Sequence, residues 1–270
     1  MSTAPIGVFD SGLGGLTVAR AIYRALPHES TVYFGDTARV PYGPKSPAVV
    51  RRYSLEIGDW LVRQGAKAVV VACNTSTAHA LDALVEALPV PVIGVIEPGA
   101  RAAVRAATDR PIGVIGTAGT IGSQAYQRAM LRLRPGTTVV ARPCPLFVPF
   151  VEEGWFDHPA TRLVAEEYLR PLFDRNIASL VLGCTHYPLL KPLLGSLAGP
   201  GVALIDSADE TAAAIAALLA SRGLAAPPRA AADVIHRFAV SDDPERFRTV
   251  GGRFLGTPLG PAEVVSLGGR

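Results

Sequence analysis

Short runs of apolar residues alternate along the chain with longer segments in which apolar residues recur at helical spacing. The runs are rich in valine and isoleucine and lack polar alternation, which is typical of strands buried on both faces of a sheet. We predict eight such strands: Ile6–Asp10, Thr31–Gly35, Ala68–Cys73, Val92–Ile96, Ile112–Gly116, Thr138–Ala141, Leu180–Cys184 and Val202–Asp206. The intervening segments predict helices that include Ala48–Arg63, Thr77–Leu88, Ser123–Leu133 and Ala160–Arg175. This alternation indicates an α/β fold with mostly parallel sheets.

The sequence contains an internal repeat. Segment Ile6–Gly12 resembles Ile112–Ala118, and Ala68–Thr75 resembles Ser179–His186; the members of the two pairs lie 106 and 111 positions apart. Because the separations nearly agree, we predict two pseudo-symmetric α/β units with the active site between them. Any two buried strands share some likeness, but that alternative does not explain a cysteine at the same strand end in both units.

The limits of the two units follow from the breaks in the pattern. We expect the first domain to comprise residues 1–97 and 207–270, and the second to comprise residues 98–206, with a helix over Pro98–Arg105 as the link.

The C-terminal tail has its own pattern after the predicted helix Glu210–Ala220. Ala225–Pro228 interrupts the chain like a linker. A strand over Val234–Val240, a short helix over Pro244–Phe254 and a last strand near Val264 follow. We expect this tail to pack back on the first unit.

Composition excludes several classes of protein. With 270 residues, 49% apolar and 18% charged, the chain is long enough for two small cores and too apolar for disorder. Its longest apolar run, Ala212–Ala220, is too short to span a membrane, and its N-terminus lacks a signal-peptide pattern, so we expect a cytoplasmic protein. The net charge is +3 with scattered arginines, which disfavours nucleic-acid binding.

The cysteines and lysines are few. Cys73, Cys144 and Cys184 are odd in number and form no C-x-x-C pair, which disfavours a disulfide framework or a structural zinc site. Only three lysines occur, and none has the position of a Schiff-base anchor, which pyridoxal phosphate requires. We therefore expect neither a cofactor nor a metal.

Ligands of parallel α/β sheets bind beyond the carboxyl ends of the strands. Polar, small or reactive residues stand at those ends: Asp10–Gly15, Asp36 with the Pro41–Gly43 loop, Cys73–Thr75, Thr117, Cys144 with the loop to Glu152 and Glu153, and Cys184–His186.

A nucleotide site is the first alternative at these ends. Gly12 and Gly14 begin a glycine-rich turn, and Asp36 would suit a ribose hydroxyl. However, the sixth position of the pattern is Thr17 instead of glycine, and Asp10 lies where a pyrophosphate needs neutral donors. We therefore disfavour a dinucleotide site, and the phosphate-binding P-loop motif is absent.

The two cysteines at equivalent strand ends indicate a function more specifically than the glycine-rich turn does. A lone buried cysteine usually serves as a small apolar residue. A thiol that faces a helix N-terminus or a cationic histidine is shifted toward thiolate. Asn74–Thr75 and Thr185–His186 follow the two thiols, and we expect them to open the next helices, where they can cap the helix or hold a carboxylate.

Two thiols on opposite sides of one ligand suit a racemase. Such an enzyme removes an α-proton from one face and returns a proton to the other, so it needs one base per face. Asp10 and His186 are placed to shuttle protons for Cys73 and Cys184. Cys144 stands between two prolines without a counterpart in the first unit, and we predict that it is inert.

Several long motifs in one order resemble the cofactor-independent aspartate/glutamate racemase family. They are Gly7–Val18, Tyr33–Gly43, Val71–Thr75, Val95–Gly99, Ile112–Thr117, Cys144–Pro149, Glu152–Gly154 and Leu182–Leu190, and the tail segment Asp243–Phe247 is also similar. The resemblance implies interconversion of L- and D-glutamate, a supply of D-glutamate for peptidoglycan, and a homodimer. An aspartate or other amino-acid racemase, or a non-catalytic amino-acid-binding module, are the alternatives.

The resemblance also implies roles for individual residues. Cys73 would deprotonate D-glutamate with help from Asp10, and Cys184 would deprotonate L-glutamate with help from His186 and Glu152, although the neighbouring Glu153 is easily confused with Glu152. The implied substrate-binding residues are Asp10, Ser11, Pro41, Tyr42, Gly43, Asn74, Thr75, Thr117, Thr185 and His186.

Overall fold

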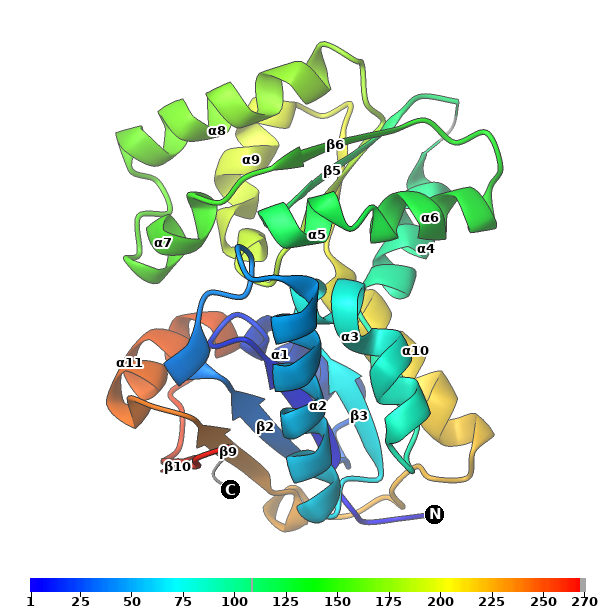
Figure 1. Cartoon of the computed structure of the whole chain (residues 1–270), viewed down its shortest axis with the longest axis vertical. Coiled ribbons are helices and arrows are strands. Elements are labelled where there is room, and N and C mark those ends of the chain that lie inside the picture. The colour runs from blue at the N-terminus through cyan, green and yellow to red at the C-terminus, as the bar shows by residue number, and fades with distance from the viewer. Residues whose placement is uncertain (108, 268–270) are drawn as a thin grey trace.

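The computed structural model describes residues 1–107 and 109–267, which form two parallel sheets (Figure 1). The first sheet has the order β10-β9-β2-β1-β3-β4, and the second has the order β6-β5-β7-β8. The strands of the first sheet are β1 (Ile6–Asp10), β2 (Thr31–Gly35), β3 (Ala68–Val71), β4 (Val92–Gly94), β9 (His236–Val240) and β10 (Ala262–Val264). Those of the second are β5 (Ile112–Gly116), β6 (Val139–Pro143), β7 (Ser179–Gly183) and β8 (Ala203–Ile205). The predicted α/β fold class is thus confirmed.

Helices surround both sheets, and in Figure 1 the smaller sheet lies in the upper part of the view and the larger sheet in the lower part. The α-helices are α1 (Leu16–Ala25), α2 (Pro47–Arg63), α3 (Asn74–Ala87), α4 (Ile96–Ala106), α5 (Ala118–Gly122), α6 (Ala125–Leu133), α7 (Phe147–Glu152), α8 (Pro159–Phe173), α9 (Lys191–Ala198), α10 (Ser207–Ser221) and α11 (Pro244–Leu255). Two of them begin at residues of the types that commonly cap helices: Ser46 accepts from Val49 N at the start of α2, and Asp206 accepts from Ala208 N at the start of α10.

The internal repeat is visible in the strand order and in the register. Strands β2-β1-β3-β4 and β6-β5-β7-β8 follow the same order. Ile6 pairs with Ala68 and Ile112 pairs with Ser179, which are the residues that the repeat equates. The ends of β3 and β7, where Cys73 and Cys184 stand, are therefore equivalent places in the two sheets.

The element bounds differ from the predicted ones where caps and turns intervene. β3 ends at Val71 because Cys73 already caps α3, and the predicted strand end at Ile96 is the first residue of α4. α6 begins only at Ala125, since Gln124 has φ of 56°. The helices named from the sequence did not include α1, α5, α7 and α9. Of these, α1, α7 and α9 begin without a side-chain cap, whereas Thr117 caps α5.

The C-terminal tail returns to the first sheet as expected, because β9 pairs with β2 and β10 pairs with β9. Helix α10 packs on both α1 and α4, so it touches elements on either side of the expected boundary. The domain limits at residues 97/98 and 206/207 stay a prediction.

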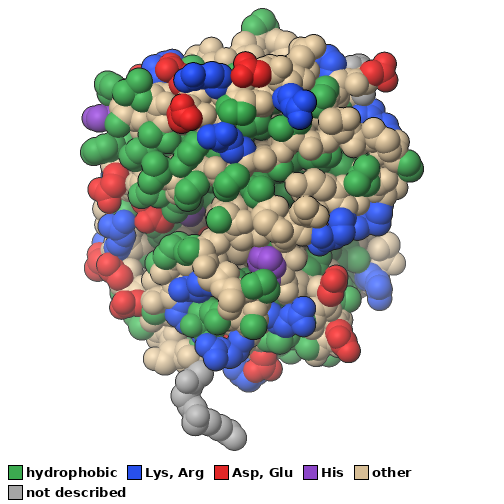
Figure 2. Space-filling view, turned by 45° about the horizontal axis from the view of Figure 1, so that its top comes forward, with side chains coloured by type: hydrophobic (Ala, Val, Ile, Leu, Met, Phe, Trp, Pro, Cys, Tyr) green, Lys and Arg blue, Asp and Glu red, His purple; other side chains and the backbone are tan. Residues whose placement is uncertain are grey.

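One face of the molecule shows how charged side chains are distributed on its surface. On the face in Figure 2, basic and acidic side chains are interspersed among hydrophobic ones. No helix in the described part of the chain is long and apolar enough to cross a membrane.

A buried ion pair ties several segments together at the amino end of the first sheet, opposite the strand ends that carry the cysteines. Lys67 Nζ lies 2.6 Å from Glu29 Oε2 and donates to the Ser2 carbonyl at 2.7 Å. Glu29 Oε1 accepts from Ala226 N at 2.7 Å. Both side chains are only 3% exposed, so each needs the other as a partner.

Replacing Lys67 by methionine should lower the free energy of unfolding by about 3–5 kcal/mol, because the Glu29 carboxylate then stays buried without its counter-charge. Urea denaturation measures the loss. Arg63→Met is the control, since Arg63 and its partner Asp59 are exposed and such a pair contributes about 0–1 kcal/mol. Adding Glu29→Gln to Lys67→Met should recover part of the loss. A Lys67→Met protein as stable as the Arg63→Met control contradicts the prediction.

Candidate active site

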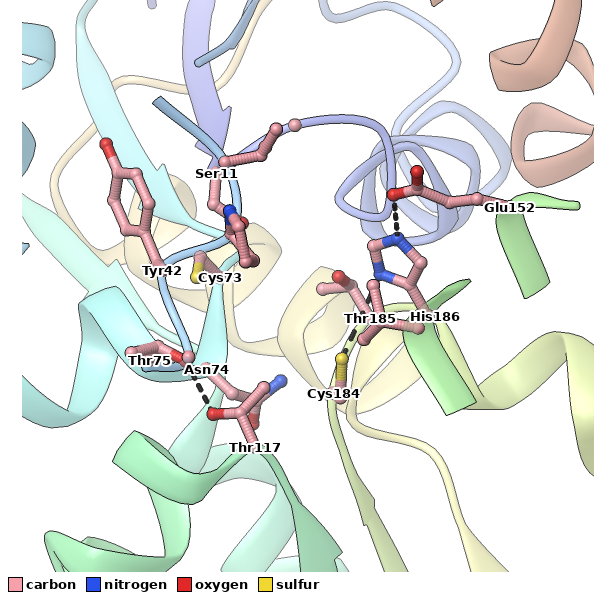
Figure 3. A pocket seen from close by; sticks show the side chains of 15 residues that line it. Ser11, Tyr42, Cys73, Asn74, Thr75, Thr117, Glu152, Cys184, Thr185 and His186 are labelled. Atoms are coloured by element: carbon pink, nitrogen blue, oxygen red, sulfur yellow. Dashed lines mark hydrogen bonds and ion pairs between the residues drawn. The ribbon is translucent and has the colours of Figure 1, made fainter. Parts of the chain in front are cut away.

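The strand ends that carry Cys73 and Cys184 open into one cavity, which residues of both sheets line (Figure 3). Its lining consists of Ser11, Gly12, Val40, Pro41, Tyr42, Gly43, Cys73, Asn74, Thr75, Thr117, Val148, Glu152, Cys184, Thr185 and His186. The structure therefore brings together every predicted site residue except Asp10, which lies directly behind the lining.

Cys73 is buried at the N-terminus of α3, and its Sγ accepts from Ser76 N at 3.4 Å. The expected shift toward thiolate is nevertheless wrong for this residue. Burial raises the pKa of the Cys73 thiol to about 11, and the Asp10 carboxylate adds to the rise, which outweighs the helix N-terminus. Near neutral pH, Cys73 is a thiol.

Asp10 is buried beside Cys73 and joins the two units. Its Oδ2 accepts from Gly12 N at 3.1 Å, and its Oδ1 accepts from Thr185 Oγ1 at 3.4 Å. Burial raises the pKa of Asp10 against the opposing effects of the His186 charge and of backbone N–H groups. A carboxyl with a raised pKa is a stronger proton acceptor for a neighbouring thiol than an exposed one.

Cys184 has a different partner, the imidazole of His186. His186 Nδ1 lies 3.9 Å from Cys184 Sγ, and His186 Nε2 lies 3.0 Å from Glu152 Oε1. Burial by itself lowers the pKa of His186, but the hydrogen bonds and charges of Cys184 and Glu152 raise it to about 10. Burial also opposes the charge on Glu152, yet His186 and Arg246 hold the pKa of that carboxyl below its usual value. The imidazole is therefore a buried cation that lies between the Cys184 sulfur and the Glu152 carboxylate.

The structure separates the two adjacent glutamates. The Glu152 side chain is 25% exposed and faces His186, whereas that of Glu153 is 64% exposed and lies 3.9 Å from Arg246. Thr185–His186 open a helix as expected; it is the short 3₁₀ helix Tyr187–Leu190, with His186 at its N-cap. This leaves His186 at a turn, where its ring can reach both Cys184 and Glu152.

The cavity holds neutral donors and acceptors between the two thiols. Thr75 Oγ1 and Thr117 Oγ1 lie 2.8 Å apart, one from each unit (dashed in Figure 3). Asn74 Oδ1 accepts from Tyr126, while its amide nitrogen is buried and has no hydrogen-bond partner among the residues that the structure describes. No lysine or arginine occurs among the described residues that line the cavity.

Tyr42 is a buried residue of the cavity lining. Its hydroxyl points away from both thiols in Figure 3 and donates to Asp36. Asp36 is fully buried and also accepts from Arg39 Nε at 2.7 Å and from Ser241 Oγ at 2.8 Å. Asp36 is thus a structural acceptor, with no exposed oxygen for a ribose.

The glycine-rich turn serves close packing between the units. A Cβ on Gly14 would lie 2.1 Å from Thr185 Oγ1 and 2.5 Å from His186 Nδ1. Thr17 Oγ1, one turn later, lies 3.3 Å from the Thr185 carbonyl. The absence of a side chain at Gly14 therefore lets the first unit meet the His186 segment of the second.

Gly12, Val40 and Val148 also line the cavity, although they are not among the substrate-binding residues that the family resemblance implies. Val148 stands four residues before Glu152 on α7 and so shares its face, which is a signal that the helix pattern could have supplied. Cys144 is buried outside the lining, and its Sγ lies 3.7 Å from the Arg142 carbonyl. Among the described residues, no group of three or more histidine, cysteine or acidic side chains could hold a metal ion.

Comparison with known proteins agrees with this geometry. The model of the Asp/Glu/Hydantoin racemase family matches residues 6–215. The chain belongs to this racemase family. The match includes both strand ends with their cysteines and all of the lining residues.

Individual relatives in this racemase family are similar over nearly the full chain. The glutamate racemase of Geobacter metallireducens is 53% identical over 97% of this chain and 96% of its own. The crystal structure of glutamate racemase from Francisella tularensis in complex with D-glutamate has a TM-score of 0.92, with 39% identity and 98% of each chain covered. The structure from Thermus thermophilus in complex with β-chloro-D-alanine has a TM-score of 0.88, with 49% identity and 98% of each chain covered.

Gly14→Ala should destabilise the fold by about 1–3 kcal/mol and lower any activity that depends on His186, because the new methyl group must displace Thr185 or the imidazole. Urea denaturation and the rate of glutamate racemisation measure the two effects. Gly122→Ala is the matched control, since a Cβ there meets nothing within 4 Å. Equal stability and activity in the two variants would show that the units do not meet at Gly14.

Proposed function

We propose that the protein interconverts L- and D-glutamate by proton transfer between two thiols, without a cofactor. The observation that carries the proposal is that Cys73 and Cys184, at equivalent strand ends of the two sheets, enter the same cavity from two units (Figure 3). The named activity of relatives at about 50% identity, such as that of Geobacter metallireducens, supports glutamate as the substrate.

The Cys184 side acts as the base for L-glutamate in this proposal. Because His186 Nε2 faces the Glu152 carboxylate, the Nδ1–H of the cationic imidazole points to Cys184 and stabilises its thiolate form. The thiolate removes the α-proton of L-glutamate and becomes a thiol. Cys73, protonated near neutral pH, donates its proton to the opposite face of the carbanion, which gives D-glutamate.

The Cys73 side acts as the base for D-glutamate in the same way. Asp10 accepts the proton of Cys73, so that the thiolate can remove the α-proton of D-glutamate while Cys184 donates to the other face. A thiol with a pKa near 11 is a strong base once deprotonated, which suits a weak carbon acid. Each cysteine is thus the acid for the other.

Neutral groups hold the substrate's charged groups in this proposal. The unpartnered Asn74 amide and the hydroxyls of Thr75, Thr117, Thr185 and Ser11 face the cavity. A buried donor without a partner is costly unless a ligand satisfies it, so Asn74 is suited to a carboxylate. The Pro41–Gly43 loop offers backbone groups, and Tyr42 closes one wall with its ring.

An aspartate or other amino-acid racemase, and an amino-acid-binding module without catalysis, are the alternatives. Neither a binder nor a sensor needs a thiol on each side of its ligand. We further propose that the product serves peptidoglycan synthesis, that the protein is cytoplasmic, and that it forms a homodimer, as the family resemblance implies.

The homodimer can be tested by size-exclusion chromatography. A dimer should elute at about twice the 28.2 kDa chain mass, and elution as a monomer overturns the proposed homodimer.

Single-thiol variants test the two-base reaction. Cys73→Ala and Cys184→Ala should each lower racemisation by at least about 10²–10⁴-fold, the usual contribution of a positioned proton-transfer group. In D₂O, Cys73→Ala should still exchange the α-proton of L-glutamate, and Cys184→Ala that of D-glutamate, as followed by proton NMR. Cys144→Ala is the control and should racemise like the unaltered protein. Absence of both exchange and racemisation in the unaltered protein would falsify the enzyme proposal.

A further inference from the structure

Helix α11 reaches from the tail of the first sheet to the proton-transfer partners of Cys184. Arg246 Nη2 lies 3.3 Å from Glu152 Oε2, while Glu152 Oε1 lies 3.0 Å from His186 Nε2. The two oxygens of the carboxylate are therefore divided between the guanidinium and the imidazole.

Two further residues of α11 contact the same groups. Arg253 Nη1 lies 3.4 Å from the Glu152 carbonyl, and the buried Phe254 ring packs edge-on against His186 with centroids 5.1 Å apart. Arg246 also lies 3.9 Å from Glu153. Asp242 and Asp243 line a neighbouring cleft with Arg246 and Glu152, so the charged groups around Glu152 come from α11, from the turn before it and from His186.

A glutamate carboxylate rotates easily about its last torsion, so one hydrogen bond does not fix it. Glu152 is at the end of α7 and partly exposed, and water competes for its free oxygen. With Arg246 on its Oε2, Glu152 keeps its Oε1 directed toward His186. An imidazole fixed in this way keeps its Nδ1 directed toward Cys184. We propose that Arg246 is a positioning residue for proton transfer at Cys184, acting through Glu152 and His186. The proposal rests on the two-thiol reaction proposed above.

Among the described residues, no side chain of α11 bonds to Cys73 or to Asp10. Asp10 is held by Gly12 N and Thr185 Oγ1, and both contacts lie at the unit junction. The loss of Arg246 should therefore affect one side of the reaction. Because the enantiomers have equal free energy, kcat/KM must remain equal in the two directions, so racemisation rates alone cannot reveal this asymmetry.

Solvent exchange in single-thiol variants separates the two sides. Arg246→Gln is added to Cys73→Ala, which exchanges L-glutamate through Cys184, and to Cys184→Ala, which exchanges D-glutamate through Cys73. The ratio of L-side to D-side exchange should fall about tenfold, the effect of losing an outer hydrogen-bond partner of a functional histidine. Arg248→Gln is the matched control, since Arg248 is about as exposed as Arg246 on α11 and, within the described part of the chain, its one ion pair is with Glu245 of its own helix.

The pH profile gives an independent readout in the protein with both thiols. Arg246 holds the pKa of Glu152 down, so Arg246→Gln should move the acid limb of kcat/KM to higher pH, and Arg246→Lys should return it toward the original position. An unchanged exchange ratio, or parallel losses on both sides, overturns the role of Arg246. If neither single-thiol protein exchanges either enantiomer, the two-thiol reaction itself fails, and the role of Arg246 fails with it.

Discussion

The site depends on the close approach of the two sheets at their carboxyl edges. Neither sheet alone places two thiols around a ligand; the cavity exists because Gly14 allows the first unit to touch Thr185 and His186. Gly119 N donates to the Gly43 carbonyl at 2.9 Å on the other side of the cavity, again at residues without side chains. Hydrogen bonds between Thr185 and Asp10 and between Thr75 and Thr117 then fix the distance between the two edges.

Pseudo-symmetry of the backbone is combined with asymmetry of the chemistry. The strands share order and register, so the two cysteines occupy equivalent places. Their partners differ: a buried carboxylate stands beside Cys73, and a cationic imidazole stands beside Cys184. A carboxylate disfavours a neighbouring thiolate and an imidazolium favours it. The two cysteines therefore have chemically different neighbours, although the two units share one strand order.

The sequence allowed the strands, the repeat and most of the site to be predicted, because buried parallel strands are apolar runs and their carboxyl ends carry the ligand-binding residues. What it could not supply were properties that arise from burial or from contacts distant in sequence. The pKa of Cys73 depends on desolvation and on Asp10, which outweigh the helix terminus that the sequence does indicate. Asp36 looked like a free carboxylate because Ser241, one of its partners, is 205 residues away. Arg246 and Phe254 were missed for the same reason, since α11 meets Glu152 and His186 only in the folded chain.

The buried pair of Lys67 and Glu29 has a consequence for how the protein can change over time. It stands at the amino ends of the strands, whereas the thiols stand at the carboxyl ends, so the sheet itself separates the anchor from the chemistry. Substitutions that adapt the protein to heat or cold can accumulate around the anchor without contact with a reacting group. Stability and turnover thus depend on residues at opposite ends of the same strands.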